Sequence, residues 1–206
     1  MKELQPEKRE HIMDVAEKLF AENGYDATST RKIASVGKVN SAMIAYYFGS
    51  KEELYKSIIL RRIISLKSDK NITENKATKV LDKIRYIGEL YVEIFFNNRT
   101  FHKIMFREMG MTRKSEVMTI VKDRWRNNFS LIIELIEKGI KKKEIKKVDP
   151  ELFVMTLMSV PRTYVLSEAL VADIMKTKNI DAVYSKEMKE RLKVYMHHLI
   201  KTMLEK

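Results

Sequence analysis

The chain has 206 residues, of which 45% are hydrophobic, and this length allows a small domain joined to a larger one. It has no cysteine, which excludes disulfide scaffolds, thiolate zinc sites and thiol nucleophiles. It has no apolar run of the roughly 18 residues that a membrane span needs and no apolar signal segment near its start, so we expect a cytoplasmic protein. Its formal net charge of +12 comes from residues 57–206, because residues 1–56 contain nine basic and nine acidic residues and are not basic as a whole.

Helices are predicted along almost the whole chain, because only three prolines and six glycines interrupt it. Pro6 suits the first position of a helix, and Asn23-Gly24 is a strong signal for its end. A fourth helix begins at Lys51 and runs to about residue 68. With the segments described below, the pattern predicts an all-α fold of about nine helices.

Two short helices are predicted between the first and the fourth. Thr28 or Ser29 can cap one of them, and Asn40 or Ser41 can cap the other. Two capped helices about four residues apart, supported by a longer amphipathic helix, predict a helix-turn-helix at about residues 29–48. Charge is also sorted here, because residues 28–51 contain four basic residues and no acidic one. This sorting predicts one face that can approach phosphates.

The remaining helices are predicted from apolar stripes at helical spacing, over about 80–95, 101–110 and 117–140. A lysine-rich segment follows, which we interpret as a solvated helix end rather than a second nucleic-acid site. Asp149-Pro150 marks the start of a helix over about 150–172 that has apolar residues on every side. A last amphipathic helix is predicted over about 182–204.

Two stretches, "IMDVAEKLFAENGYDATSTRKIA" and "VNSAMIAYYFGSKEELYKSI", make residues 6–66 resemble the N-terminal DNA-binding domain of TetR-family transcriptional regulators. The resemblance implies an all-α protein with a helix-turn-helix domain at 6–66 and a helical effector-binding and dimerisation domain at 67–206. Two positions depart from the family pattern. Lys38 stands where a turn glycine is usual, so the turn is expected to be strained or reshaped, and Ala45 stands where many members carry a contacting tyrosine.

The resemblance also implies which residues contact DNA, since the second helix of the motif enters the major groove. The implied contacts are Thr30, Arg31, Asn40, Ser41, Ala42, Met43, Tyr46, Tyr47 and Lys51. Residues at the start of this helix would face base edges, whereas the tyrosines and Lys51 would mainly contact phosphates. Each has an ordinary alternative: Lys51 as a solvated lysine, Tyr47 as part of the core, and Asn40 as a helix cap.

A pocket for a small-molecule effector is implied within the central helices. Candidate lining residues are His102, Met105, Met109, Trp125, Phe129, Met155, Met158, Arg162 and Tyr164. Methionines and aromatics at helical spacing also suit a core, so each has a structural alternative. Arg162, in an apolar helix, requires a carboxylate partner such as Glu108, an outward path or an anionic ligand. An adaptable apolar lining favours a hydrophobic or amphiphilic effector.

The function that the resemblance implies is that of a dimeric repressor, paired through the helices at about 150–172 and 182–204 and released from a palindromic DNA operator by its effector. Activation instead of repression stays open. The alternative is a helix-turn-helix regulator whose body binds a protein partner. The sequence has no nucleophile-base-acid set, phosphate-binding glycine loop or metal-ligand spacing, so we expect no enzymatic activity, no cofactor and no metal.

Overall fold

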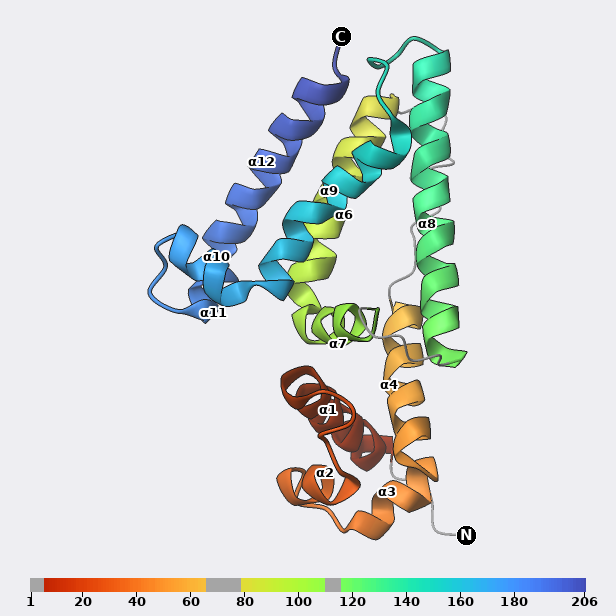
Figure 1. The fold of residues 1–206 in the computed structure, drawn as a ribbon, viewed down its shortest axis with the longest axis vertical. Coiled ribbons are helices and arrows are strands. Elements are labelled where there is room, and N and C mark those ends of the chain that lie inside the picture. Colours follow the sequence, from red (N-terminus) through yellow and green to blue (C-terminus); the bar gives the residue numbers. More distant parts are fainter. Residues whose placement is uncertain (1–5, 66–78, 110–115) are drawn as a thin grey trace. The chain divides into compact units, whose positions relative to one another are not determined.

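The computed structural model describes residues 6–65, 79–109 and 116–206, and these ranges contain helices and no strand. The first helices are α1 (Pro6–Asn23), α2 (Thr30–Val36), α3 (Ser41–Phe48) and α4 (Lys51–Ser65) (Figure 1). They are followed by α6 (Val80–Asn97), α7 (Arg99–Met109), α8 (Glu116–Lys141), α9 (Pro150–Leu166), α10 (Glu168–Ile174), α11 (Ile180–Val183) and α12 (Lys186–Leu204). The predicted all-α fold is confirmed.

The count of about nine helices was too low, because the described ranges alone contain eleven. The predicted helix over 150–172 ends at Leu166, since Ser167 leaves the helical region with φ −129° and ψ 42°, and α10 follows as a separate helix. The last helix begins at Lys186 and not at 182, because the side chain of Ser185 accepts a hydrogen bond from the Met188 amide and caps it. The predicted end of the fourth helix near 68 lies outside the described residues.

The described residues divide into two compact units. The first, which we call the head, comprises residues 6–65, 100–109 and 116–121, and the second, the body, comprises residues 79–99 and 122–206. The head therefore includes α7 residues that are distant from α1 to α4 in sequence. One contact inside the head shows this: Nη1 of Arg107 donates a hydrogen bond to the Phe20 carbonyl oxygen over 3.2 Å.

The head core supports the two short helices. Phe20 of α1 is 1% exposed, and its ring packs edge-on against Tyr55 of α4 with 5.3 Å between centroids. Ile33 of α2 and Ile44 of α3 are buried against this scaffold. Burial of these side chains orients the opposite, polar sides of α2 and α3 outward.

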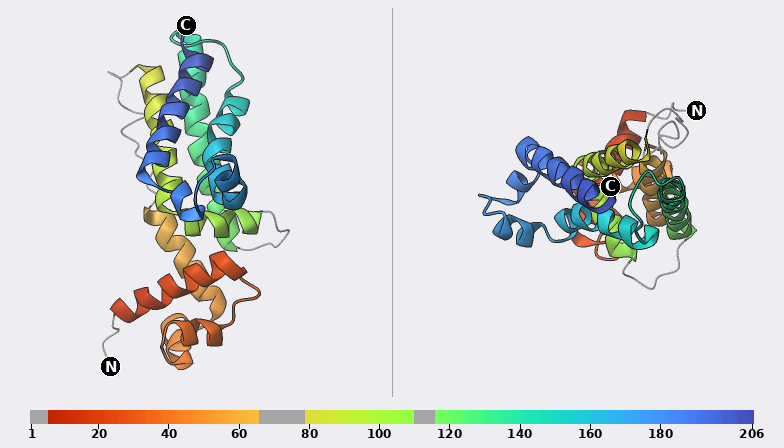
Figure 2. Two further views of the ribbon diagram at one scale, coloured as in Figure 1. Left: turned by 90° about the vertical axis from the view of Figure 1, so that its left-hand side faces the viewer. Right: turned by 90° about the horizontal axis from the view of Figure 1, so that it is seen from above.

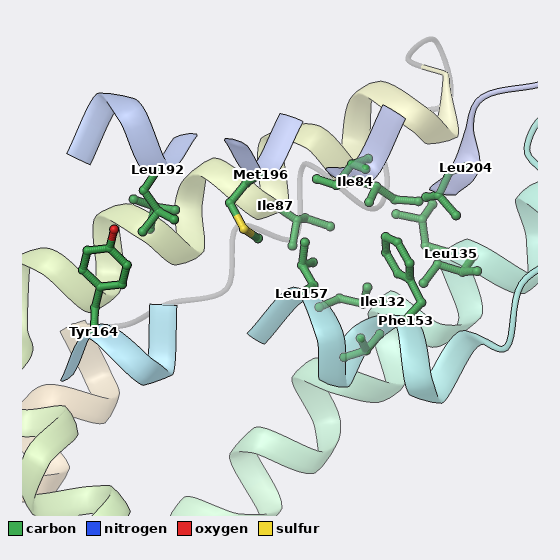
Figure 3. Packing of buried hydrophobic residues seen from close by; sticks show 14 of the residues in the cluster. Ile84, Ile87, Ile132, Leu135, Phe153, Leu157, Tyr164, Leu192, Met196 and Leu204 are labelled. Carbon is green, nitrogen blue, oxygen red and sulfur yellow. The ribbon is translucent and has the colours of Figure 1, made fainter. Parts of the chain in front are cut away.

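The body core lies mainly between α6, α9 and α12, and α6 and α12 lie side by side in both views of Figure 2. Figure 3 shows Ile87 of α6, Leu157 of α9 and Met196 of α12 pointing toward one another. Gly88 allows the close approach of α12, because a Cβ atom there would lie 2.9 Å from Cδ1 of Ile200. In the parts of the chain that are described, no helix combines the length and apolarity needed to cross a membrane.

Candidate nucleic-acid interface

Side-chain caps begin both helices of the predicted helix-turn-helix. Oγ of Ser29 accepts a hydrogen bond from the Lys32 amide over 3.1 Å, and Oδ1 of Asn40 accepts one from the Ala42 amide over 2.9 Å. Thr28, the other candidate for the first cap, is buried, and its hydroxyl donates to the Gly24 carbonyl oxygen over 2.8 Å. Each cap satisfies an amide that the first helical turn leaves without a partner, and so sets where the helix starts.

The turn between α2 and α3 closes with a Schellman motif. The Lys38 amide donates to the Ser35 carbonyl oxygen over 3.2 Å, and the Val39 amide donates to the Ala34 carbonyl oxygen over 3.0 Å. This motif places its C′ residue in the left-handed region, and Lys38 has φ +51°. The turn thus keeps its ordinary shape, and the strain expected from the missing glycine lies at Lys38.

The glycine one position earlier does not take the left-handed conformation. Gly37 has an ordinary φ of −77°, and its carbonyl oxygen lies 2.9 Å from Nε2 of His11 on α1. A Cβ atom at Gly37 would lie 3.1 Å from the Ile33 carbonyl oxygen and would also face Val15. The 3.1 Å contact is with α2 itself, whereas the nearest α1 atom, Cγ2 of Val15, would lie at an ordinary 3.7 Å, and Gly37 does not relieve the strain at Lys38.

The helix α3 has a buried side and an exposed side. Ile44 and Phe48 are buried, and the guanidinium carbon of Arg9 lies 5.1 Å from the centroid of the Phe48 ring. Tyr46 is 62% exposed, and its ring contacts that of Tyr47 with 5.2 Å between centroids. The side of α3 that does not pack on the head is thus available to a partner.

The nine candidate DNA contacts lie on α2, on α3, at the α3 cap and at the first residue of α4, and none is buried. The exposed ones are Arg31, Asn40, Ser41, Ala42 and Tyr46, and the partly exposed ones are Thr30, Met43, Tyr47 and Lys51. Ala45, where relatives often carry tyrosine, is exposed as well. Throughout the described ranges, the side chains of Arg31 and Lys38 have no hydrogen-bond or ion-pair partner, so their charges are not compensated within the chain.

Lys51 has structural partners that its sequence position did not reveal. Its Nζ donates to the carbonyl oxygens of Tyr25 over 2.9 Å and Thr28 over 3.1 Å, and it lies 4.1 Å from the centroid of the Tyr25 ring. These contacts attach the segment between α1 and α2 to the start of α4. They involve backbone oxygens more than 20 residues away in the chain, and a local pattern carries no signal for such partners.

The candidate effector residues are distributed over both units. His102, Met105 and Met109 belong to α7 in the head, and the other six belong to the body. Burial lowers the pKa of His102 to about 4, which favours the neutral ring at pH 7. His102, Met105 and Tyr164 are buried, Met109, Met155 and Arg162 are exposed, and Trp125, Phe129 and Met158 are partly exposed.

Two of the candidates, Met155 and Arg162, are more exposed in the single chain than the lining of a pocket would be. Met155 is 68% exposed and Arg162 is exposed as well, which agrees with an outward path for Arg162. Tyr164 belongs to the body core, where its ring lies 5.7 Å from that of Phe96. Trp125 and Phe129 contact each other on α8 with 6.2 Å between centroids.

Comparison with known proteins agrees with this arrangement. Residues 12–58 match the profile of bacterial regulatory proteins of the tetR family. The chain is 24% identical over 206 residues to the probable HTH-type transcriptional regulator YttP of Bacillus subtilis (strain 168), covering 94% of each chain. It is 27% identical over 161 residues to the HTH-type regulator YhgD of the same organism, covering 72% of this chain and 78% of YhgD.

A solved structure shares the fold over nearly the whole length. The ketosteroid transcriptional regulator KstR2 of Mycobacterium tuberculosis superposes with a TM-score of 0.79 at 15% identity, covering 99% of this chain and 98% of KstR2. At that identity the likeness concerns the fold, whereas the profile match covers the helix-turn-helix itself. The chain is therefore a helix-turn-helix DNA-binding transcriptional regulator of the tetR family.

Proposed function

We propose that this regulator binds a palindromic DNA operator as a homodimer and acts as a repressor that a small-molecule effector releases. The observation that carries the DNA-binding part is the exposed side of α2 and α3, which presents uncompensated positive charge within a stretch free of acidic residues. A backbone of phosphates attracts such a surface independently of sequence, and base contacts from α3 then select the site.

The start of α3 is proposed to read base edges. Ser41 and Ala42 are exposed beside the Asn40 cap, and small side chains allow the helix backbone to approach the groove closely. The cap engages Oδ1 of Asn40 but leaves its amide group as a donor and a second lone pair on the oxygen. Met43 is proposed to contact a thymine methyl group.

Phosphate contacts are proposed for Thr30, Arg31, Tyr46, Tyr47 and Lys51. Arg31 and Tyr46 are the most accessible of these, because both are exposed. The ammonium group of Lys51 already donates hydrogen bonds to two carbonyl oxygens in the segment after α1. A phosphate would therefore compete with these oxygens for the same ammonium group. We therefore expect Arg31 to contribute more than Lys51 to the salt dependence of binding.

Dimerisation is proposed to occur through α9 and α12. Both helices expose large apolar side chains: Leu152, Met155 and Leu166 on α9, and Val194 and Tyr195 on α12. Exposed apolar groups of this size on two neighbouring helices are typical of a subunit interface. A two-fold dimer would carry two heads and match a palindromic site.

Release by an effector is proposed to follow from linkage. A ligand that binds more tightly to a dimer unable to contact DNA shifts the population toward that state, by no more than its difference in affinity for the two states. The partly exposed aromatic pair Trp125 and Phe129, with Met158, supplies apolar contacts in the body for a hydrophobic or amphiphilic molecule.

The test is selection of bound duplexes from a random DNA pool, followed by affinity measurements with variants. We expect a palindromic consensus. Arg31→Ala and Tyr47→Phe should weaken binding to all duplexes. Arg31→Ala should also reduce the salt slope, which is the slope of the logarithm of the binding constant against the logarithm of the salt concentration. Asn40→Ala should alter base preference. Arg126→Ala, which removes an exposed arginine paired with Asp123 in the body, is the matched control and should bind normally. Selection of no consensus would exclude the proposal, and repeating it with candidate small molecules tests release.

A further inference from the structure

We propose that Lys38, in the turn between α2 and α3, is a DNA phosphate contact that the protein keeps in a left-handed backbone conformation at the expense of its own stability. The inference rests on the proposed DNA-binding function. It adds a contact at a position where glycine would adopt the left-handed conformation with less strain than lysine. It is carried by the backbone at Lys38, by two comparable turns in the body and by the charge around the turn.

Three turns in the described chain share one geometry. The non-glycine residues with positive φ in the described ranges are Lys38 at +51°, Lys143 at +59° and Lys176 at +53°. Each is the C′ residue of a Schellman motif, after α2, α8 and α10 respectively. The Glu144 amide donates to the Gly139 carbonyl oxygen over 2.9 Å, and the Thr177 amide donates to the Ala172 carbonyl oxygen over 3.0 Å, as Val39 does in the head. Glycine is the residue that this position favours, because a Cβ atom makes the left-handed region costly.

The strain at Lys38 cannot move to the neighbouring glycine. Gly37 keeps the right-handed conformation, with φ −77°, and its carbonyl oxygen lies 2.9 Å from Nε2 of His11 on α1. Sliding α2 along the chain by one residue would expose Ile33 and Ala34, which are buried. Position 38 must therefore be left-handed, and the lysine there is tolerated at a cost that glycine would remove.

A lysine near a helix C-terminus also complements the helix dipole, and this explanation suits the two turns of the body. Their surroundings contain acidic residues: Glu144, which pairs with Lys142 over 3.9 Å, directly follows Lys143, and Asp173 lies three residues before Lys176. Lys38 instead lies in the stretch 28–51, which has no acidic residue. Like those of Lys143 and Lys176, its exposed side chain has no hydrogen-bond or ion-pair partner within the described residues, so the missing acidic neighbour is what distinguishes it. Its charge is thus available to an anion from outside the chain.

The place of the turn identifies that anion. Lys38 precedes Asn40, the cap of the helix that is proposed to enter the major groove. When the start of such a helix lies in the groove, the residues just before it pass the groove edge, where the phosphates are. A flexible four-carbon side chain with a compact charge at its end suits a phosphate contact that does not read sequence.

The experiment compares Lys38→Gly with two matched controls, Lys143→Gly and Lys176→Gly, which remove a lysine from the same geometry in the body. Thermal unfolding should show a rise in Tm of about 2–4 °C for each of the three, because glycine relieves the same strain. Binding to the selected duplex should then be titrated at several salt concentrations. Lys38→Gly should lower the salt slope by about one for each head and weaken binding by roughly eightfold per head near 0.1 M salt, whereas the controls should leave both quantities unchanged.

A second variant separates charge from backbone conformation. Lys38→Arg keeps the charge and the left-handed strain, so it should retain the salt slope and show no rise in Tm, whereas Lys38→Asn should lose the slope. An unchanged salt slope in Lys38→Gly, or an equal decrease in the controls, would overturn the proposal while leaving the DNA-binding function intact. If the unaltered chain selected no duplex, both would fail, and the rise in Tm would still report the strain.

Discussion

At the scale of single residues, Asn40 and Lys51 each combine a structural hydrogen bond with a position on the proposed DNA-binding side. The Asn40 side chain caps α3, and the Lys51 ammonium holds two carbonyl oxygens of the segment before α2. The sequence predicted a cap at Asn40 or Ser41, because both residue types favour the start of a helix, and the structure shows that Asn40 provides it. The two partners of Lys51 were not predictable, since they depend on how the chain folds back on itself.

His102 provides a pH prediction at the same scale. Burial lowers its pKa to about 4, from an ordinary value near 6.5, so the unfolded chain binds a proton there before the folded chain does. Stability is therefore complete above about pH 6.5, and the free energy of unfolding falls as pH drops from 6.5 toward 4. His102→Phe, which keeps an aromatic ring of similar size among Phe101 and Phe106, should reduce this loss.

Urea unfolding at pH 7.5 and at pH 5 checks the His102 prediction. The control is His198→Gln, because His198 is exposed and its removal should leave the pH dependence unchanged. Glu93 also loses a stabilising interaction in acid, since its hydrogen bonds to Lys193 and Lys189 lower the pKa of its carboxyl. That loss begins only below its ordinary value near 4.5, so it does not overlap most of the His102 window. Equal pH dependence in the wild type and His102→Phe would refute the assignment.

At the scale of elements, the contact between α1 and α4 depends on a carboxylate that is almost completely buried. The Glu17 side chain is 4% exposed and lies 2.8 Å from Nη2 of Arg61 and 3.0 Å from Nη2 of Arg62. Arg61 is 24% exposed and also contacts Glu10 over 2.7 Å and Asp14 over 2.9 Å. The carboxylate and the two guanidinium groups thus differ in burial, because Glu17 is almost inaccessible to water whereas Arg61 and Arg62 are partly exposed.

This difference in burial predicts that removing the Glu17 charge and removing the two arginine charges lower the free energy of unfolding by different amounts. Glu17→Gln should destabilise the protein by about 1 kcal/mol, because both arginines can still reach solvent and Arg61 keeps two carboxylates. The double variant Arg61→Met, Arg62→Met should cost about 3–5 kcal/mol, since it leaves a buried charge without compensation. Adding Glu17→Met to the double variant should recover much of the loss.

Denaturant unfolding of the four proteins measures these differences. A loss of stability in Glu17→Gln that equals or exceeds the loss in the double arginine variant would contradict this prediction. The fully apolar triple variant serves as the control for packing, because its side chains are similar in volume to those replaced. If the triple variant were as unstable as the double variant, lost packing rather than an uncompensated carboxylate would explain the effect.

Helix boundaries show which elements the sequence could predict. The start of α9 agrees with the Asp149-Pro150 signal, and Oδ1 of Asp149 accepts a hydrogen bond from the Leu152 amide over 2.9 Å. The end of the same helix was predicted six residues too far, because the apolar pattern continues through α10 although the backbone bends at Ser167. Apolar periodicity reports which side chains are buried, but it does not report a change of direction between two helices that are both partly buried.

At the scale of the whole molecule, the proposed dimer makes a prediction for the exposed apolar residues of α9 and α12. Met155 and Val194 are 68% and 69% exposed in the single chain. Introducing lysine at both positions would bring like charges together across a two-fold axis and bury them, so the dimer should dissociate at least about a hundredfold more readily. Analytical ultracentrifugation over a concentration series measures this change.

A lysine at an exposed leucine outside these helices is the matched control. Leu131 of α8 is 37% exposed, and Leu131→Lys should leave the association state unchanged. The monomeric variant should also bind a palindromic duplex far more weakly than the wild type but retain weak binding to a half-site, because each head keeps its own contacts. A wild-type protein that is monomeric at micromolar concentration would rule out the proposed interface.

The sequence by itself determined the helical class, the start of each short helix of the helix-turn-helix to within one residue, and the acid-free stretch that carries its charge, because these depend on residues close together in the chain. Only the tertiary structure decided what Lys51 binds, that Met155 and Arg162 are exposed, and that Lys38 takes the left-handed conformation while Gly37 does not. The strain at Lys38 follows from the packing of α2, whose residues Ile33 and Ala34 are buried. A glycine and a lysine side by side do not show which of them must take the left-handed conformation until the burial of Ile33 and Ala34 fixes where α2 ends.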